Sequence, residues 1–406
     1  MTKKSDTPAI RFKGFTDTWE QRKLGGMASL ITKGTTPLDK SNTGVVNFVK
    51  IESIDESSGN ITITQKISLD EHNGYLHRSQ LKENDILFSI AGTLGRVTSV
   101  KSSILPANTN QALAIIRLKD GCLDYVKTYL KGKAVADFIK KNPTIGAQPN
   151  LSLEQVANLE IAIPSEDEQK KIGAFFQQLD NLITLHQRKY DKLTNVKKSM
   201  LEKMFPKNGS NVPEIRFKGF TEAWEQRKFS ELYEKVSRKN DLTYGKDDII
   251  SVANMYFKED SYITDESYLL TYNIFELGDI AFEGNKSKNY AHGRFVENTI
   301  GNGIVSHVFD VFKPIMKPYD LQFWKYAINN EQLMGGILLR STKASTMMTN
   351  LVANDFLQET FLTPTYPEQQ KIGAFFQQLD NLITLHQREL EKLKNIKKSC
   401  LENMFV

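Results

Sequence analysis

The feature of this 406-residue sequence that most constrains its fold is a segment that occurs twice. Glu168–Arg188 reads EQKKIGAFFQQLDNLITLHQR and Glu368–Arg388 reads EQQKIGAFFQQLDNLITLHQR, so the two copies differ at one position. A second segment, the leading repeat, reads PAIRFKGFTDTWEQRK at Pro8–Lys23 and PEIRFKGFTEAWEQRK at Pro213–Lys228. The repeating unit is therefore about half the chain, and two units do not make a solenoid. We expect two similar domains related by an approximate two-fold axis.

The first of these segments, the helical repeat, has the periodicity of a long helix. Apolar residues recur at spacings of three, four and seven over residues 172–204 and 372–404. Pro164 and Pro206 bracket the first stretch, and Pro367 falls where a helix begins and proline is tolerated. Each helix would have about 38 residues, and an amphipathic helix of that length needs a partner. We expect the two helices to pair antiparallel; the alternative is that each packs only on its own domain.

On each helix, one set of residues is expected to line the seam between the helices or to contact a partner protein. These residues are Phe175, Phe176, Leu179, Leu182, His186, Phe375, Phe376, Leu379, Leu382 and His386. The two histidines occupy matching positions, and no Cys, Asp or second His follows three or four residues later. A packed or hydrogen-bonded histidine is therefore expected rather than a metal ligand.

The stretches between the repeats have the character of mixed α and β domains. VVNFVKIESI, NITITQKISL and DILFSIAGTLGRVTSV in the first half, and DIISVANMYF and GIVSHVFDVF in the second, are β-rich and punctuated by Gly, Asn and Ser. Short helical patterns such as LDYVKTYLKGKAVADFIKK lie between them. We predict an α+β fold with two mixed α/β globules, residues 1–165 and 207–365, separated by a long antiparallel two-helix coiled coil formed by residues 166–206 and 366–406, with pseudo-two-fold symmetry.

Composition narrows the class of protein. The chain is long enough, at 40% hydrophobic content, for more than one core, and no stretch approaches eighteen consecutive apolar residues. The N-terminal MTKKSDTPAI is not followed by an apolar signal region, so we expect a cytoplasmic protein without a membrane partner. Cys122 and Cys400 have neither metal-ligand spacing nor a disulfide framework. A net charge of +5 falls short of a strongly basic nucleic-acid binder and leaves the partner open.

The sequence carries no recognisable catalytic motif. NPTI at Asn142 lacks the second proline and the aromatic residue of the Asn-Pro-Pro-aromatic motif of amino-methyltransferases, and no glycine-rich cofactor loop precedes it. YGKDD at Tyr244 lacks the upstream glycine and the hydroxyl residue of a phosphate-binding loop. We therefore expect no catalytic residues, no bound cofactor and no metal in this chain.

The order of these segments resembles a known family. WEQRK closes each leading repeat, DILFSIAGTLG lies in the first globule, NLSLEQV precedes IPSEDEQKKIGAFF at the first helix, and PEQQKIGAFF begins the second helix. Over essentially the whole chain this pattern resembles the DNA-specificity (S) subunit of type I restriction-modification enzymes. The second globule departs from the pattern, because it has EGNKSKNYAHGRF where the first has SIAGTLGRV.

The resemblance implies a non-catalytic subunit of a multisubunit methyltransferase and endonuclease. Each globule would be a target-recognition domain that reads one half of a split site in double-stranded DNA, and the helices would be spacers and docking surfaces. The implied partners are two methylation subunits, which bind S-adenosylmethionine and methylate adenine, and two motor-endonuclease subunits, which use ATP and Mg. The stretches between the repeats would differ because each globule reads a different half-site.

Candidate DNA contacts are polar and cationic loop side chains, because base edges need hydrogen-bonding groups and phosphates need cations. In the first globule they are Lys33, Thr35, Thr36, Arg78, Thr93, Arg96, Asn110, Gln111, Lys141 and Gln148. In the second they are Asn285, Lys286, Lys288, Asn289, Arg294, Arg340, Ser341, Lys343 and Ser345.

Two other functions stay open at the level of sequence. A coiled-coil scaffold without nucleic-acid function would agree with the modest net charge of +5. A self-sufficient DNA methyltransferase would need the cofactor loop that the sequence lacks.

Overall fold

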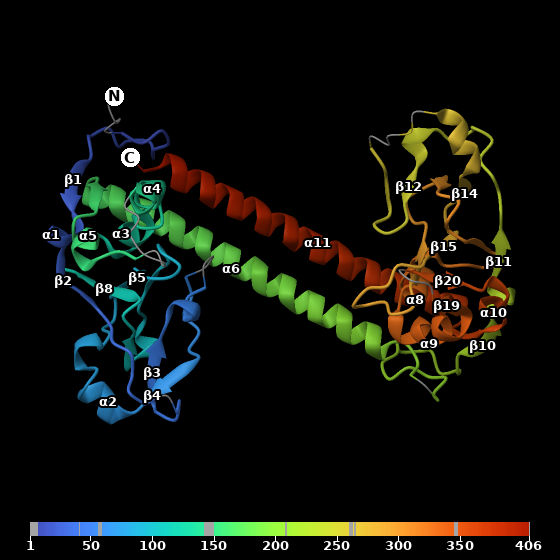
Figure 1. The fold of residues 1–406 in the computed structure, drawn as a ribbon, viewed down its shortest axis with the longest axis horizontal. Coiled ribbons are helices and arrows are strands. Elements are labelled where there is room, and N and C mark those ends of the chain that lie inside the picture. The colour runs from blue at the N-terminus through green and yellow to red at the C-terminus, as the bar shows by residue number, and fades with distance from the viewer. Residues whose placement is uncertain are drawn as a thin grey trace. The chain divides into compact units, whose positions relative to one another are not determined.

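The chain folds into two compact units (Figure 1). The structure is a computed structural model and describes residues 7–39, 41–55, 59–141, 150–207, 209–259, 263, 265–344 and 348–405. The first unit comprises Met1–Lys189 and His386–Val406, and the second comprises Tyr190–Leu385. Each unit combines short helices and largely antiparallel sheets with part of both long helices, which confirms the predicted α+β class.

The first unit is built on a four-stranded antiparallel sheet with strand order β2–β8–β5–β6. A second sheet has the order β4–β3–β7, and β1 pairs with β9. The strands are β1 (Glu20–Lys23), β2 (Ala28–Lys33), β3 (Val46–Val49), β4 (Gln65–Ile67), β5 (Ile86–Ser89), β6 (Val97–Ser99), β7 (Ala107–Thr109), β8 (Leu113–Leu118) and β9 (Glu160–Ile163). The short helices are α1 (Leu24–Met27), α2 (Leu69–Asn73), α3 (Leu123–Tyr129), α4 (Lys133–Lys141) and α5 (Leu153–Ala157). The apolar face of the four-stranded sheet packs against α3 and the first long helix to form the main core.

The second unit repeats this plan with a four-stranded antiparallel sheet ordered β11–β18–β15–β16. The further pairs are β10–β21, β12–β13, β14–β17 and β19–β20. The strands are β10 (Glu225–Lys228), β11 (Tyr233–Val236), β12 (Ile250–Ser251), β13 (Tyr256–Phe257), β14 (Asn273–Phe275), β15 (Ile280–Glu283), β16 (Arg294–Glu297), β17 (Gly303–Val305), β18 (Val311–Pro314), β19 (Thr342–Ala344), β20 (Thr349–Leu351) and β21 (Thr360–Thr363). The helices are α7 (Phe229–Leu232), α8 (Leu321–Ile328), α9 (Glu331–Ser341) and α10 (Ala353–Gln358).

The two long helices, α6 (Glu166–Lys203) and α11 (Tyr366–Asn403), have 38 residues each, as predicted. The start of α6 is fixed by Ser165, whose Oγ accepts a hydrogen bond from the backbone N–H of Glu168 at 3.4 Å. Three acidic residues in the first turn favour the positive end of the helix dipole. No helix in the described part of the chain is both long and apolar enough to span a membrane.

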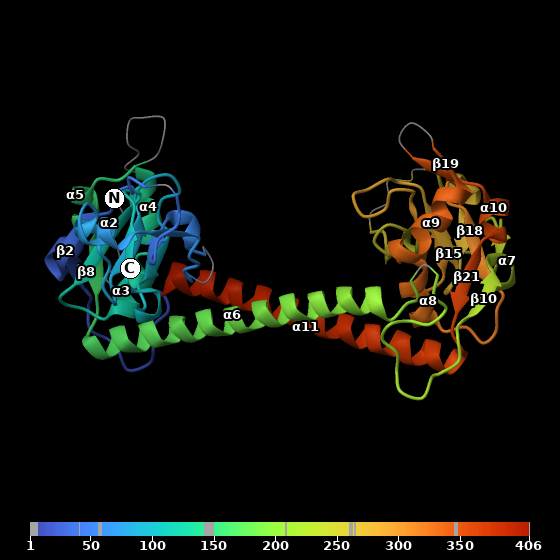
Figure 2. The same cartoon turned by 90° about the horizontal axis from the view of Figure 1, so that it is seen from below.

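Within each unit the parts of α6 and α11 run antiparallel, as predicted (Figures 1 and 2). In the first unit Lys397 Nζ lies 2.5 Å from Asp180 Oδ1, and the Phe405 ring, just after α11, lies 5.7 Å from that of Phe176. Residue numbers therefore rise along one helix as they fall along the other. In the second unit the same contact recurs between Lys197 and Asp380, again at 2.5 Å. In each unit the parts of both helices also pack on the globule, so pairing of the helices and packing on a globule both occur.

The side of α6 that faces the core is narrower than the pattern of apolar residues predicted. Phe176, Leu179 and Ile183 are buried, at spacings of three and four. Leu182 and its repeat Leu382, which were expected at the seam or at a contact with a partner protein, are 43% and 44% exposed. A seam between two helices has two apolar positions in every seven residues, so it accepts only one of the neighbours Leu182 and Ile183. Ile183 is the one that is buried.

His186 and His386 lie beside each other in the first unit. Their Nδ1 atoms are 3.1 Å apart and their ring centroids 5.1 Å apart. One Nδ1 must donate and the other accept, which requires at least one neutral ring. Burial, followed by the charges of His186 and Lys189, lowers the pKa of His386.

The leading repeat and the helical repeat contact each other in both units, which explains why they recur together. In the first unit the Arg11 guanidinium donates two hydrogen bonds, of 2.7 and 2.8 Å, to the buried Glu168 carboxylate. In the second unit Arg216 binds Glu368 in the same way at 2.6 and 2.7 Å. The half-buried Phe175 and Phe375 rings pack edge-on against phenylalanines of the leading repeat.

A glycine in each helical repeat allows α6 and α11 to approach the short helices closely. A Cβ at Gly173 would lie 2.9 Å from Asp124 Cβ and 3.1 Å from the Tyr125 nitrogen. A Cβ at Gly373 would lie 2.7 Å from the Phe323 nitrogen. The duplicated glycine therefore packs α6 on α3, and α11 on α8, at a distance that a larger residue would not permit.

Candidate nucleic-acid interface

In the first unit, several predicted DNA-contacting residues come together at one edge of the four-stranded sheet. Strands β2 and β5 end here and β8 begins here, because the register pairs Lys33 with Ala114 and Ser89 with Leu113. We call the loops at this edge, residues 34–36, 90–96 and 110–112, the first loop set. Two sequence segments that are far apart, TKGTTP and NTNQA, thereby become neighbours.

The loops after β2 and before β8 are joined directly. Thr36 Oγ1 donates a hydrogen bond to Gln111 Oε1 at 2.6 Å, and the Thr35 backbone N–H donates to the Thr109 carbonyl at 3.1 Å. A Cβ at Gly34 would lie 1.9 Å from the Thr109 carbonyl oxygen, so only glycine permits this approach. The arrangement leaves the hydroxyl and amide groups of this pair at the surface.

Hydrogen bonds of Ser89 and Arg96 fix the glycine-containing loop between β5 and β6. Ser89 Oγ donates to the Thr93 carbonyl at 2.6 Å and accepts from the Arg96 backbone N–H at 2.7 Å. The Arg96 guanidinium turns back and donates to the Ile51 and Ile54 carbonyls, each at 3.2 Å. Thr93 is exposed at the tip of the loop, whereas Arg96 anchors the loop to the body of the unit.

The same loop is bridged to the segment that precedes α5. Ala91 forms an antiparallel bridge with Asn150, and the Leu151 backbone N–H donates to the Ile90 carbonyl at 2.8 Å. Of the predicted residues nearby, Lys141 is exposed at the end of α4, and Gln148 lies outside the described residues.

The remaining candidates of the first unit divide by exposure. Lys33, Thr36, Arg78, Thr93, Gln111 and Lys141 are exposed, whereas Thr35, Arg96 and Asn110 are half-buried. Arg78 lies in the short turn His77–Ser79, whose next residue, Gln80, bridges to Asn108 of β7. Arg78 is therefore placed next to the three-stranded sheet.

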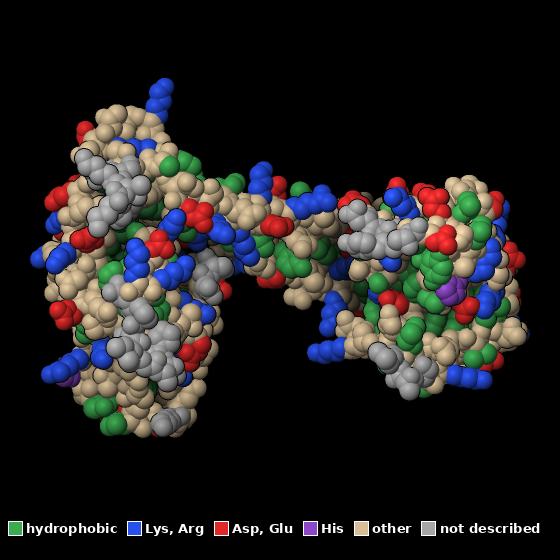
Figure 3. Space-filling view, turned by 45° about the horizontal axis from the view of Figure 1, so that its top comes forward, with side chains coloured by type: hydrophobic (Ala, Val, Ile, Leu, Met, Phe, Trp, Pro, Cys, Tyr) green, Lys and Arg blue, Asp and Glu red, His purple; other side chains and the backbone are tan. Residues whose placement is uncertain are grey.

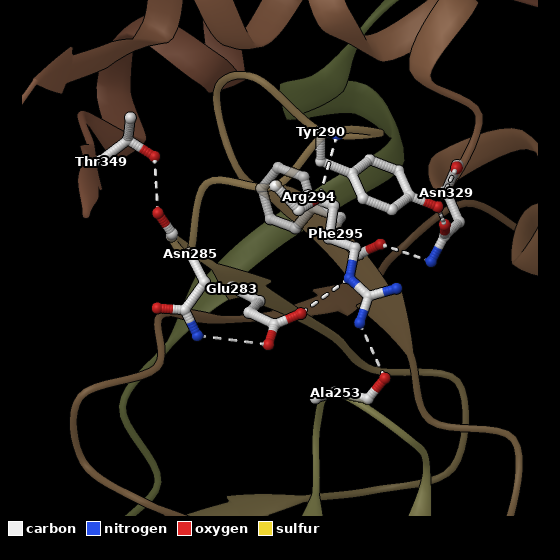
Figure 4. Close-up of polar contacts among 10 residues, drawn as sticks. Ala253, Glu283, Asn285, Tyr290, Arg294, Phe295, Asn329 and Thr349 are labelled. Atoms are coloured by element: carbon white, nitrogen blue, oxygen red, sulfur yellow. Dashed lines mark hydrogen bonds and ion pairs between the residues drawn. The ribbon is translucent and has the colours of Figure 1, made fainter. Parts of the chain in front are cut away.

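The corresponding loop of the second unit, residues 284–293 between β15 and β16, is longer and is braced by Arg294 (Figure 4). Arg294 Nε donates to Glu283 Oε2 at 2.7 Å, and Nη2 donates to the Ala253 carbonyl at 2.7 Å. Its guanidinium carbon lies 5.1 Å from the centroid of the Tyr290 ring, and the Tyr290 hydroxyl donates to Asn329 Oδ1 at 2.5 Å. Arg294 therefore positions the loop.

The hairpin of β19 and β20 lies against this loop. Thr349 Oγ1 donates to the Gly284 and His292 carbonyls at 3.1 and 3.0 Å, and the Thr349 side chain points toward the start of this loop (Figure 4). Asn285 forms an antiparallel bridge with Met348. This bridge occupies the same place in the fold as that between Ala91 and Asn150. We call residues 284–293 and the described part of the hairpin the second loop set.

In the second unit, too, the structure separates exposed candidates from internal ones. Asn285, Lys286, Lys288, Asn289 and Lys343 are exposed in the second loop set. Arg340 is exposed but makes two hydrogen bonds to Glu359, which raise the pKa of its guanidinium. Ser341 is fully buried and donates to the Ile337 carbonyl at 2.9 Å, so it presents no group to a ligand. Ser345 lies outside the described residues.

Charges of both signs are mixed on the visible face of the first unit. On the face of the first unit seen in Figure 3, Lys and Arg side chains are interspersed with Asp and Glu. This pattern agrees with the net charge of +5. Any contact with DNA would therefore depend on local clusters such as Lys286 and Lys288 rather than on the charge of the whole chain.

Several residues that hold the two loop sets were not predicted from sequence. Asn150, Tyr290, Asn329 and Thr349 join segments that lie far apart along the chain. The position of Tyr290 between Lys288 and Arg294 is the one available sequence signal, because an aromatic residue next to cations permits a cation–π contact. Among the residues that the structure describes, no group of three His, Cys, Asp or Glu side chains forms a metal site.

The chain is similar in sequence to known proteins. Residues 16–195 match the family model described as Type I restriction modification DNA specificity domain. The chain is 23% identical over 421 residues to the type I restriction enzyme MjaVIII specificity subunit of Methanocaldococcus jannaschii, with 94% of this chain and 91% of the relative covered. It is 22% identical over 417 residues to the putative MjaX specificity subunit of the same organism, with 94% and 92% covered.

The fold is also similar to that of a solved structure. The S subunit of a type I restriction-modification system from M. genitalium aligns with a TM-score of 0.57 and 15% identity, covering 98% of this chain and 99% of that chain. Residues 16–195 therefore match this domain family, and the chain as a whole is similar in sequence to type I restriction enzyme specificity subunits.

Proposed function

We propose that this specificity subunit reads a two-part site in double-stranded DNA, with one loop set for each half-site. The observation that carries the proposal is the contrast between the repeated and unrepeated parts of the chain. The repeats recur almost residue for residue, whereas the loops at the corresponding sheet edges, such as AGTLG and GNKSKNYAHG, differ in length and chemistry. A common scaffold with different loops suits two readers of different sequences.

We further propose that the helical repeats dock two methylation subunits. Leu182 and Leu185 are 43% and 45% exposed in the first unit, and Leu382 and Leu385 are 44% and 51% exposed in the second. The same apolar surface is therefore present twice, which suits two copies of one partner. In this proposal the chain itself is not catalytic: S-adenosylmethionine binds the methylation subunits, and ATP and Mg bind two motor-endonuclease subunits.

The DNA contact is tested by comparing lysines at opposite ends of one sheet. Lys286 and Lys288 follow β15, whereas the exposed Lys317 follows β18 at the other end. In the complex with the methylation subunits, replacing Lys286 and Lys288 by alanine should weaken DNA binding and reduce the slope of log K against log salt by about 1 for each phosphate that a lysine no longer neutralises. Lys317→Ala should leave the slope unchanged. An equal effect of both changes would contradict an interface at this edge.

The assignment of one half-site to each unit is tested by exchange. Residues 24–163 lie between the first leading repeat and the first helix, so they can be replaced by the matching stretch of another specificity subunit. The methylated motif, sequenced genome-wide in cells that carry the complex, should change in one half and keep the other. A motif changed in both halves would exclude independent readers.

Docking on the helices is tested through stoichiometry. Leu182→Asp should remove one methylation subunit from the assembly, and Leu182→Asp combined with Leu382→Asp should remove both, as measured by native mass spectrometry. Gln178→Glu introduces one negative charge at an exposed position of the same helix and serves as the control. A complete assembly with the doubly substituted chain would rule out docking at these leucines.

A further inference from the structure

A small polar cavity in the first unit lies outside the proposed DNA-reading edge. It has a volume of about 90 Å³ and is lined by β6, α3, α6, Gly59 and Asn60. Its lining includes three lysines, Lys101, Lys127 and Lys131, the carboxylates of Asp124 and Asp180, and the amides of Asn60 and Asn181. Such a space has room for a few water molecules or one small polyatomic ion, and its walls carry more ammonium groups than carboxylates.

Lys131 is the largely buried lysine of this cavity that forms no ion pair among the described residues. Lys127 Nζ is paired with Asp124 at 2.6 Å, and the neighbouring Lys397 Nζ is paired with Asp180 at 2.5 Å. Among the described residues, Lys131 makes no hydrogen bond or ion pair, and its Nζ lies 3.2 Å from the place of a Cβ on Gly59. Asp180 and Asp55 lie near enough to raise the pKa of Lys131, but neither forms an ion pair with it. The charge of this largely buried ammonium is therefore only partly neutralised, and a ligand could complete the neutralisation.

The second unit fills the equivalent place with its own side chain. The backbone nitrogens of Tyr125 and Phe323 both approach the duplicated glycine, so Thr128 corresponds to Tyr326 and Lys131 to Asn329. The Tyr326 hydroxyl donates to Asp380 Oδ2 at 2.6 Å. The helical repeat is thus the same in both units. In the first unit the smaller Thr128 leaves the space open, and Lys131 faces it. In the second unit Tyr326 takes the place of Thr128, and Asn329 takes the place of the lysine.

We propose that this cavity binds a phosphate-class oxyanion, with Lys131 as its main counter-charge. Ammonium groups and side-chain amides on several walls match the oxygens of a tetrahedral anion, which accept hydrogen bonds in several directions. Two sources have this chemistry: a phosphate of the DNA backbone and free inorganic phosphate. Anion binding does not depend on the assignment of half-sites, so it can be tested in the absence of DNA.

The charge on Lys131 makes the affinity sensitive to pH. Burial, and then the nearby Lys397, lowers the pKa of Lys131 to about 8. Asp180 and Asp55 act in the opposite direction, and Lys127 adds to the lowering. Phosphate affinity should therefore fall as the pH rises through about 8, because the ammonium loses its charge.

The first experiment titrates the purified full chain with inorganic phosphate at constant ionic strength and follows the Tm. Phosphate should stabilise the wild type in proportion to its occupancy. Lys131→Gln should weaken the apparent Kd about tenfold or more, the loss expected for a hydrogen bond between charged groups. Lys133→Gln makes the same charge change at an exposed residue two positions away and should leave the Kd unchanged. Equal responses of all three proteins to phosphate would overturn the proposal.

A second variant guards against a folding defect in Lys131→Gln. Thr128→Tyr copies the second unit and fills the cavity while it keeps the lysine, so it too should abolish the response to phosphate. An unchanged response in a folded Thr128→Tyr protein would also overturn the proposal, because the ligand would then lie elsewhere.

To identify the source of the anion, the salt dependence of DNA binding is measured with the same variants in the complex with methylation subunits. If the ligand is a backbone phosphate, Lys131→Gln should lower the slope of log K against log salt by about 1. If it is free phosphate, the slope should stay the same while the phosphate response is lost. Either result supports the oxyanion site. Loss of DNA binding in the Lys286 and Lys288 variants with an intact phosphate response would separate this site from the proposed reading edge.

Discussion

Phe176 offers a direct test of how the long helices are held in the two units. Its side chain is 1% exposed, and its ring lies 5.7 Å from that of Phe405, which comes from the other end of the chain. The first unit therefore depends on a contact between residues that only the folded chain brings together. We expect Phe176→Ala to destabilise the first unit and to leave the second largely intact.

The magnitude follows from burial. Replacing a fully buried phenylalanine by alanine costs about 3–5 kcal/mol, because it removes apolar contact and leaves a cavity. Each 1.4 kcal/mol is a factor of about ten in an equilibrium constant, so the population of the opened first unit should rise by about 10²–10⁴-fold. Amide exchange in a cooperative unit reports this population directly.

Hydrogen exchange followed by mass spectrometry separates the two units. Peptides that cover β5 and β8 should lose protection in Phe176→Ala, whereas those that cover β15 and β18 should not. Phe376→Ala, its repeat in the second unit with 0% exposure, should give the reverse pattern. Phe175→Ala is the matched control, because Phe175 is half-buried and should have a smaller effect. Equal loss of protection in both units after either change would refute the division into units.

Three further predictions concern charged groups. Arg216→Met leaves the buried Glu368 carboxylate without its partner and should lower the free energy of unfolding in urea by about 3–5 kcal/mol. Adding Glu368→Gln in a double variant should restore most of this loss. Additive losses from the two changes would argue against the pair. Burial raises the pKa of Glu297 well above its usual value. The contribution of this carboxyl group to stability is therefore complete below its unfolded-state pKa and is lost as the pH rises through its folded-state pKa. Glu297→Gln should raise the Tm more at pH 8 than at pH 4, and an equal gain at both would exclude this cause. Burial lowers the pKa of His386. The stability that the neutral ring contributes is present above the unfolded-state pKa of about 6.5 and is lost as the pH falls through the lower folded-state pKa. His386→Gln should reduce the fall in Tm between pH 7 and pH 5, and an unchanged fall would contradict the role of the pair.

The repeated helices could be predicted from sequence because their signal is long and local. An apolar period sustained over 38 residues has few alternatives to a helix, and prolines mark its limits. The choice between neighbouring apolar residues could not be predicted in the same way. Leu182 and Ile183 both fit a helical stripe, and the one that is buried depends on the angle at which α6 meets the globule and α11.

The loops were predicted as clusters but not residue by residue, for a physical reason. An arginine next to a buried strand can face solvent or return to the body of the protein, and sequence does not distinguish the two. Arg96 returns because the Ile51 and Ile54 carbonyls, more than forty residues earlier, lie within its reach. Arg294 is drawn inward in the same way by Glu283 and the Ala253 carbonyl. The exposed lysines have no such partners in the hydrogen bonds described.

The pairing of the two repeats explains why one part of each unit can stay the same while the other differs. Arg11 and Glu168 form a buried ion pair, so a change in either leaves a charge without its partner. Gly173 is held by its approach to α3, and Phe175 by its contact with Phe12. The loops at the sheet edge carry a lighter constraint, because their exposed side chains can change without leaving a cavity or an unpaired buried charge. A protein built in this way can acquire a new loop set while the parts that fold it and pair its helices keep their sequence.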